Sequence, residues 1–175
     1  MRYSPPHYET VARSIVSQQL SAKAAATIYG RLAEAAGPAG VTPAAVLAFS
    51  AGQLRAFGLS AAKCRYVRSL AEKTLDGTVD FARLPRLNDE EVIAHLTEVQ
   101  GVGVWTAHMF LIFALKRRDV LPVGDAGIRN AMRAVYRLLA PPSPQEMERI
   151  ARPWRPYASV ASWYLWRSLE FDATL

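Results

Sequence analysis

Apolar side chains recur every three or four residues along most of the chain, which is the spacing of helices with one buried face. The segment 7–19 shows this spacing on one side, at Tyr8, Val11, Ile15 and Val16. The segment 61–76 repeats it, at Tyr66, Val67, Leu70 and Ala71. No segment has the apolar–polar alternation of a half-buried strand. The pattern therefore predicts an all-α fold of about nine or ten short helices.

Helix start and stop signals divide this pattern into elements. Three starts have capping-box spacing, with Gln or Glu three residues after the cap, at Ser50, Asn88 and Ser143. Other starts are expected after Ser4-Pro5-Pro6 and at Ser21, Thr42, Ser60 and Asp125, and ends at Gly37, Gly58 and Gly77. We expect the helix after Asp125 to run through Ala140, and the last helix to run from about Arg155 to Leu169.

Composition and charge narrow the classes of protein. The 175 residues are 51% hydrophobic, enough for a single compact domain over residues 1–175. The net charge of +6 permits an anionic partner without proving one. The single cysteine, Cys64, excludes an internal disulfide and a four-cysteine iron–sulfur cluster. No run of about 18 apolar residues and no signal peptide are present, so we expect a cytoplasmic protein without a membrane segment.

The stretch 98–130 carries the most specific chemistry. In QGVGVW, Gly101 and Gly103 allow a sharp turn and a close approach of the backbone to a ligand. Amides near the start of the following helix, about Gly103 to Trp105, suit a phosphate and would read no base sequence. A plain corner between two helices also needs glycine, so both interpretations stay open. The basic loop at Lys116, Arg117 and Arg118 favours the phosphate.

Asp125 also has two compatible interpretations. Aspartate is a favoured helix N-cap, and its backbone hydrogen bonds favour the ionised carboxylate. A fixed carboxylate beside a sugar–phosphate backbone would stabilise the oxocarbenium-like sugar that forms when an N-glycosidic bond breaks, or would orient or deprotonate a water.

Aromatic residues are concentrated in the helix after the glycine turn and in the last helix. They are Trp105, Trp154, Trp163, Tyr164 and Trp166. Such faces stack on an extruded base, worth about 1–3 kcal/mol per base, and attract a cationic alkylated purine. For Trp154 and Trp166 we expect burial in the core instead.

Residues 98–130 resemble the signature of the helix-hairpin-helix DNA glycosylase superfamily. The form GVGVWTA followed by DVLPVGDAGIRNAM resembles its alkylation-repair branch, the 3-methyladenine DNA glycosylases. Blocks at 12–32, 54–71 and 154–167 agree, so that the resemblance covers about residues 5–170. It implies one compact domain of two lobes that share a DNA-binding cleft, with the helix-hairpin-helix motif at about 88–115.

The resemblance also implies residue roles. Asp125 matches the catalytic aspartate, and Trp105, Met109 and Trp163 match positions around the extruded base. Gln19 falls where the family inserts a side chain into the gap left by that base, with Gln18 as its less favoured substitute. The hairpin residues expected at the DNA backbone are Gly101, Val102, Gly103, Val104 and Thr106. Carbonyls of Thr97, Val99 and Val102 match those that hold a structural Na⁺ or K⁺ in relatives; no other cofactor is implied.

Trp105 stands where bifunctional relatives carry a lysine that forms an imine. The resemblance therefore implies a monofunctional glycosylase without lyase activity, which acts in base excision repair on double-stranded DNA with damaged bases. We expect it to be a monomer, and to be associated with the nucleoid if the host is bacterial. The alternative is a non-catalytic helix-hairpin-helix module that binds distorted duplex. Met109 replaces a pocket aromatic, and the alkylated base that is removed stays open.

Overall fold

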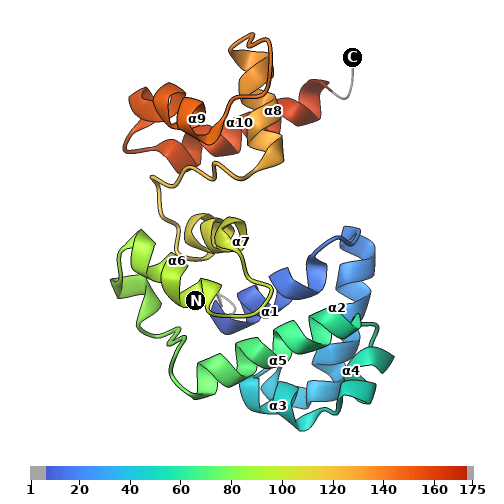
Figure 1. The fold of residues 1–175 in the computed structure, drawn as a ribbon. Helices are drawn as coiled ribbons and strands as arrows, with labels where there is room; N and C mark the ends of the chain where they lie inside the picture. The colour runs from blue at the N-terminus through green and yellow to red at the C-terminus, as the bar shows by residue number, and fades with distance from the viewer. Residues whose placement is uncertain (1–6, 173–175) are drawn as a thin grey trace. The chain divides into compact units, whose positions relative to one another are not determined.

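The computed structural model describes residues 7–172, and within that range it contains helices and no strand. The ten α-helices are α1 (His7–Ser17), α2 (Ala22–Ala36), α3 (Pro43–Ala48), α4 (Ala51–Ala56), α5 (Ala61–Leu75), α6 (Asp89–Thr97), α7 (Val104–Met109), α8 (Ala126–Val135), α9 (Pro144–Ala151) and α10 (Ala158–Asp172) (Figure 1). The all-α prediction is confirmed. None of the described helices is long and apolar enough to cross a membrane.

Short 3₁₀- and π-helical turns complete the described chain. They lie at Gly37–Ala39, Leu84–Arg86 and Arg152–Trp154, with a π-helical turn at Phe110–Ala114 directly after α7. The start signal predicted at Ser4-Pro5-Pro6 lies outside the described residues. The chain divides into two units, 1–107 and 108–175, each with its own core. The predicted cleft between two lobes stays a prediction.

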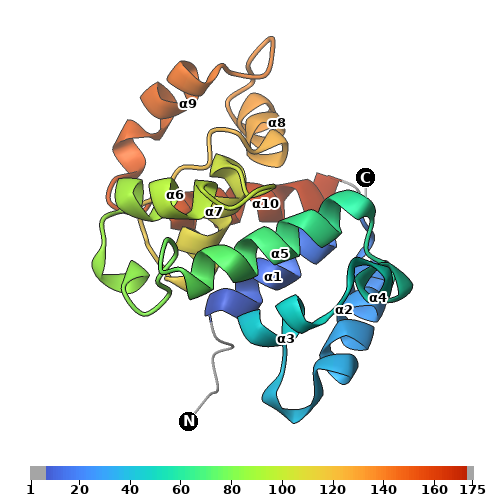
Figure 2. The ribbon, with the colours of Figure 1, turned by 60° about the horizontal axis from the view of Figure 1, so that its bottom comes forward.

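The first unit packs α1, α2, α3 and α4 around α5. Contacts join α5 to α1, α3 and α4, and α1 to α2, and Figure 2 shows α5 running alongside α1. The predicted apolar stripes form this core, because Ile15, Val16, Val67 and Leu70 are all fully buried. Burial of such a side chain contributes about 1.5–3 kcal/mol, so these stripes fix the position of the helices that carry the loops described below.

The second unit is built on α8 and α10, which pack against each other. Its core contains Ile128 and Met132 of α8, Met147 of α9 and Leu165 of α10. This packing places the N-terminus of α8 against the middle of α10. Asp125, the N-cap of α8, therefore meets side chains about forty residues later in the sequence.

Three predicted helix boundaries were wrong. α8 ends at Val135, not Ala140, because Arg137 adopts a left-handed φ of 52° and the amides of Arg137 and Leu138 turn back to earlier carbonyls. No glycine marks that end. α10 begins at Ala158, not Arg155, because Arg155 is extended before Pro156 (ψ 134°), as residues before proline prefer. The first helix also ends at Ser17, two residues before the predicted Gln19.

Candidate functional site

The hairpin between α6 and α7 turns at Gly101. Its φ is +83°, and a Cβ built on it would lie 2.2 Å from Cδ2 of Tyr66, a contact that real Cβ atoms do not make. Gly103 differs: its φ is outside the left-handed region and a Cβ there would have open space. The turn thus requires glycine at position 101 and does not require it at position 103. Gly103 is exposed and leaves room for a ligand at the start of α7.

The predicted DNA-binding residues of the hairpin differ in their exposure to solvent. Gly101, Gly103 and Val104 are exposed, whereas Val102 and Thr106 are buried. The side chains of Val102 and Thr106 therefore hold the turn in place. The exposed backbone of the other three forms the surface of the hairpin.

The three predicted cation ligands fit a monovalent ion by their chemistry. Thr97 uses its hydroxyl to hydrogen-bond the carbonyls of Ile93 and Ala94, so that only its backbone oxygen is offered as a ligand. The carbonyl of Val99 accepts the amide of Val102 at 3.0 Å and has a second lone pair. Neutral carbonyl oxygens without a carboxylate suit Na⁺ or K⁺.

The loop after α1 is held by Lys63 and by the hairpin. Nζ of Lys63 donates to the carbonyls of Val16 (2.6 Å) and Gln18 (2.7 Å), and burial lowers the pKa of this ammonium. The side chain of Gln18 donates to the carbonyl of Gly101 at 2.9 Å. Gln19 is exposed and has a left-handed φ of 56°. Gln18 is thus engaged with the hairpin, and Gln19 projects from the loop.

A cavity of about 430 Å³ adjoins this loop within the first unit. Gln18, Gln19, Trp105 and Thr106 line it together with Ser14 and Ser17. The indole of Trp105 is about half exposed, so it presents an aromatic face beside the loop. The structure therefore brings three predicted elements together: the loop residue Gln19, the hairpin helix and Trp105.

Asp125 lies in the second unit and is buried. Its Oδ1 accepts the backbone N–H of Ile128 at 2.8 Å, which confirms the predicted N-cap. The same oxygen accepts the indole N–H of Trp166 at 3.0 Å. Phe113, from the π-helical turn after α7, stacks on that indole with centroids 5.7 Å apart and ring planes at 30°. Trp154 and Trp166 both pack against the core of the second unit, as expected, and the polar edge of half-buried Trp166 also bonds the carboxylate.

Trp163, one turn earlier on α10, is about half exposed. It borders a cavity of about 440 Å³ whose wall combines Phe113, Trp163 and Tyr164 with Lys116, Arg117 and Arg118. The guanidinium of Arg167 lies 5.8 Å above the indole. Met109 is half-buried and lines neither cavity. Aromatic faces and positive charge thus meet around Trp163.

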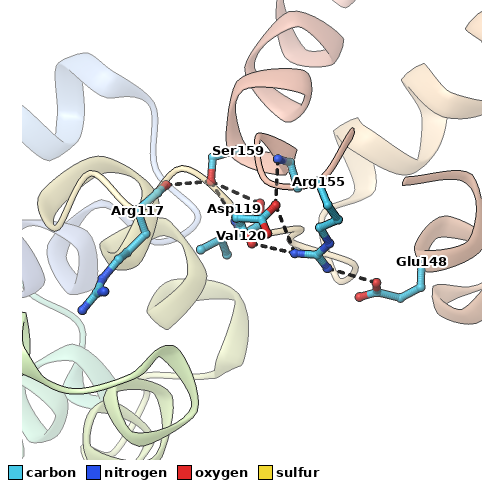
Figure 3. Close-up of polar contacts among 7 residues, drawn as sticks. Arg117, Asp119, Val120, Glu148, Arg155 and Ser159 are labelled. Atoms are coloured by element: carbon cyan, nitrogen blue, oxygen red, sulfur yellow. Dashed lines mark hydrogen bonds and ion pairs between the residues drawn. The ribbon is translucent and has the colours of Figure 1, made fainter. Parts of the chain in front are cut away.

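The segment that leads to Asp125 is fastened to the start of α10. The hydroxyl of buried Ser159 donates to the carbonyl of Arg117 (2.7 Å) and accepts the amide of Val120 (2.9 Å), as Figure 3 shows. Arg155 donates to the carbonyl of Asp119 (2.7 Å) and pairs with Glu148 (3.3 Å). Sequence patterns did not indicate this network, because the two segments that it joins lie about forty residues apart.

Comparison with known proteins places these features in a family. Residues 12–156 match the model of the HhH-GPD superfamily of base excision DNA repair proteins. DNA-3-methyladenine glycosylase 1 of Schizosaccharomyces pombe is 36% identical over 163 residues, which are 92% of this chain and 72% of that protein.

Two crystal structures have the same fold at similar identity. A DNA-3-methyladenine glycosidase from Bacillus halodurans gives a TM-score of 0.87 at 36% identity, over 98% of this chain and 79% of that one. The 3-methyladenine DNA glycosylase Mag1 of Schizosaccharomyces pombe, in complex with abasic DNA, gives 0.82 at 34%, over 97% and 87%. The chain belongs to the HhH-GPD superfamily of base excision DNA repair proteins.

Proposed function

We propose that this protein is a monofunctional DNA glycosylase of the 3-methyladenine type. It binds double-stranded DNA, extrudes an alkylated nucleotide and hydrolyses its N-glycosidic bond, which leaves an abasic site for base excision repair. The observation that carries the proposal is the buried carboxylate of Asp125, which a backbone amide and the indole of Trp166 hold by one oxygen.

The chemistry needs little beyond that carboxylate. When the bond between C1′ and the base nitrogen breaks, its electron pair leaves with the base, and the sugar becomes an oxocarbenium-like cation. A fixed negative charge stabilises this cation in a buried site more than it would in water. Water then adds to C1′ and gives up a proton. An alkylated base that is already cationic leaves as a neutral molecule, so it needs no protonation.

The first unit binds the DNA backbone. The hairpin at Gly101, Val102, Gly103, Val104 and Thr106 holds a phosphate, because its turn is exposed and Gly103 admits a close approach. The carbonyls of Thr97, Val99 and Val102 would hold a Na⁺ or K⁺ there, whose charge attracts the same phosphate.

Gln19 enters the gap in the base stack. Two observations support Gln19 over Gln18: Gln19 is exposed to solvent, and the side chain of Gln18 is bound to the hairpin. The carboxamide of Gln19 has donors and an acceptor with which it can meet the unpaired base of the opposite strand.

As the family resemblance implies, we expect Trp105, Met109 and Trp163 to contact the extruded base. Both indoles expose about half of their surface, which suits stacking on a cationic purine. An indole at position 105 cannot form an imine with the sugar, so the reaction stops at the abasic site. A non-catalytic DNA-binding module would account for the hairpin but not for the held carboxylate of Asp125. We expect a monomer that acts in the compartment holding the genome.

Incubation with dimethyl-sulfate-treated duplex DNA, followed by chromatography of released bases, tests the proposal. The wild type should release 3-methyladenine or related bases, and strands should break only after alkaline treatment. Asp125→Asn should slow release by at least 100-fold while binding a duplex with a tetrahydrofuran abasic site. Asp80→Asn, a matched charge change at an exposed aspartate, should release bases at the wild-type rate. Wild-type rates in Asp125→Asn would refute the assignment.

A further inference from the structure

We propose that Gln18 is a positioning residue, which ties the loop of Gln19 to the hairpin and so places Gln19 against the base stack when the hairpin binds DNA. The inference rests on the proposed function and adds to it the residue that links backbone binding to base extrusion. Its basis is the side-chain amide of Gln18, which donates to the carbonyl of Gly101 at 2.9 Å, 83 positions later in the chain.

The backbone of this loop is held from the side of α5. Nζ of Lys63, near the start of α5, donates to the carbonyl of Val16 at 2.6 Å and to that of Gln18 at 2.7 Å. Hydrogen bonds from a charged donor are about twice as strong as those between neutral groups. The two carbonyls lie just before Gln19, so the ammonium fixes the backbone from which the side chain of Gln19 extends.

The hairpin is supported by the next two turns of the same helix. The ring of Tyr66 lies against Gly101, where a Cβ would come within 2.2 Å of it. The hydroxyl of Ser69 accepts the amide of Gln100 at 3.1 Å. Lys63, Tyr66 and Ser69 are spaced three residues apart, so they follow one side of α5. That side of α5 therefore supports both segments, first the loop and then the hairpin.

Gln18 joins the two segments directly. Lys63 holds the backbone of Gln18, and the side chain of Gln18 holds the turn of the hairpin, so this residue fixes the distance between Gln19 and the amides at Gly103. An inserting side chain needs that distance to be set in advance, because a group that is held in place binds better than one that must first be ordered. The bond also keeps the side chain of Gln18 out of the gap, which leaves insertion to the exposed Gln19.

The preference for a duplex with a gap measures this link. Fluorescence anisotropy gives the Kd for an undamaged duplex, which the hairpin binds by its backbone, and the Kd for a tetrahydrofuran duplex, whose gap also admits Gln19. Gln18→Met removes the donor and keeps the length of the side chain. It should raise the Kd for the tetrahydrofuran duplex by about 3- to 10-fold, the usual effect of one lost hydrogen bond. The Kd for the undamaged duplex should change less than twofold, because Tyr66 and Ser69 still support the hairpin.

Two further variants separate positioning from stability. Gln53→Met is the matched control, because Gln53 also uses its side chain to bond a backbone group, the amide of Ser50 at 2.8 Å, in the capping box of α4. It should leave both Kd values unchanged. Gln18→Asn, which keeps a polar amide and shortens its reach by one methylene, should act like Gln18→Met. Loss of folded protein would weaken binding to both duplexes equally, so the ratio of the two Kd values reports positioning.

A double-mutant cycle decides whether Gln18 acts through Gln19. Gln19→Ala alone should raise the Kd for the tetrahydrofuran duplex about tenfold, and in the Gln18→Met background it should add less than about threefold. Effects that multiply fully, or a gap preference that both Gln18 variants preserve within twofold, overturn the role of Gln18, as does a wild type without that preference. A wild type that prefers the tetrahydrofuran duplex but releases no base from methylated DNA overturns the proposed hydrolysis instead, and the cycle still decides the role of Gln18.

Discussion

Alanine in place of Gly101 and alanine in place of Gly103 should harm the protein in different ways. At Gly101 the new methyl would lie 2.2, 2.4 and 2.6 Å from three atoms of the Tyr66 ring, one of them Cγ at its base. The whole ring would have to move, and overpacking of this kind costs about 1–3 kcal/mol. The left-handed φ of +83° adds about 1–2 kcal/mol for an alanine.

Together these terms give a destabilisation of roughly 2–5 kcal/mol for Gly101→Ala. For a chain of this size, each kcal/mol lowers Tm by about 3 °C, so Tm should fall by roughly 6–15 °C. Gly103→Ala meets no atom within 4 Å and needs no unusual φ. Its Tm should stay the same or rise slightly, since alanine restricts the unfolded chain.

DNA binding should be weakened by the alanine at position 103, which leaves the stability of the protein unchanged. If phosphate approaches the amides of the hairpin, a methyl at Gly103 enters that space, and the Kd for a tetrahydrofuran duplex should rise about tenfold. Thermal melting and fluorescence anisotropy measure the two effects. Gly30→Ala is the control, because Gly30 lies exposed in α2, has open space around it and is far along the chain from the hairpin. Unchanged DNA binding by Gly103→Ala would refute the phosphate site at the hairpin. Wild-type stability of Gly101→Ala would refute the predicted clash with Tyr66.

Two further predictions concern DNA binding and base extrusion by the first unit. Lys63→Met removes both hydrogen bonds that hold the loop of Gln19, so base extrusion, followed by 2-aminopurine fluorescence in stopped flow, should slow about tenfold. Lys73→Met, at a loose 3.7 Å ion pair, should leave extrusion unchanged, and equal rates in both variants would contradict the role of Lys63. Replacement of K⁺ and Na⁺ by tetramethylammonium at constant ionic strength should weaken duplex binding several-fold, and an unchanged Kd would argue against a cation at the hairpin carbonyls.

Features that depend on neighbours in the sequence were predicted well. All three capping boxes form, at Ser50, Asn88 and Ser143, because each needs only a side chain and a backbone three residues apart. The N-cap at Asp125 follows from the same local rule. The end of α8 was missed because Arg137 takes the left-handed position that glycine usually marks. A pattern of residue types does not show that exception.

Contacts between distant segments were not predicted. Trp166 has the spacing of a core residue on α10, and nothing in its neighbours indicates that its N–H meets a carboxylate 41 positions earlier. Lys63 looks like a solvated residue of a helix, yet it bonds carbonyls 45 and 47 positions earlier. Both interactions depend on which helices pack together, so they become visible only once α8 meets α10 and α1 meets α5.

In the proposed function, the two units divide DNA binding from chemistry. Gln19, Lys63, the hairpin and Trp105 belong to the first unit, whereas Asp125 and its indole donor belong to the second. Substitutions in the first unit should therefore act mainly on DNA affinity and base extrusion, and those in the second on the rate of bond cleavage. In the proposed function the hairpin contacts only the DNA backbone, so it would not select damage. Selection would come from the step that extrudes the base and from a carboxylate that stabilises the sugar cation without protonating the base, so that only a base that leaves readily is released.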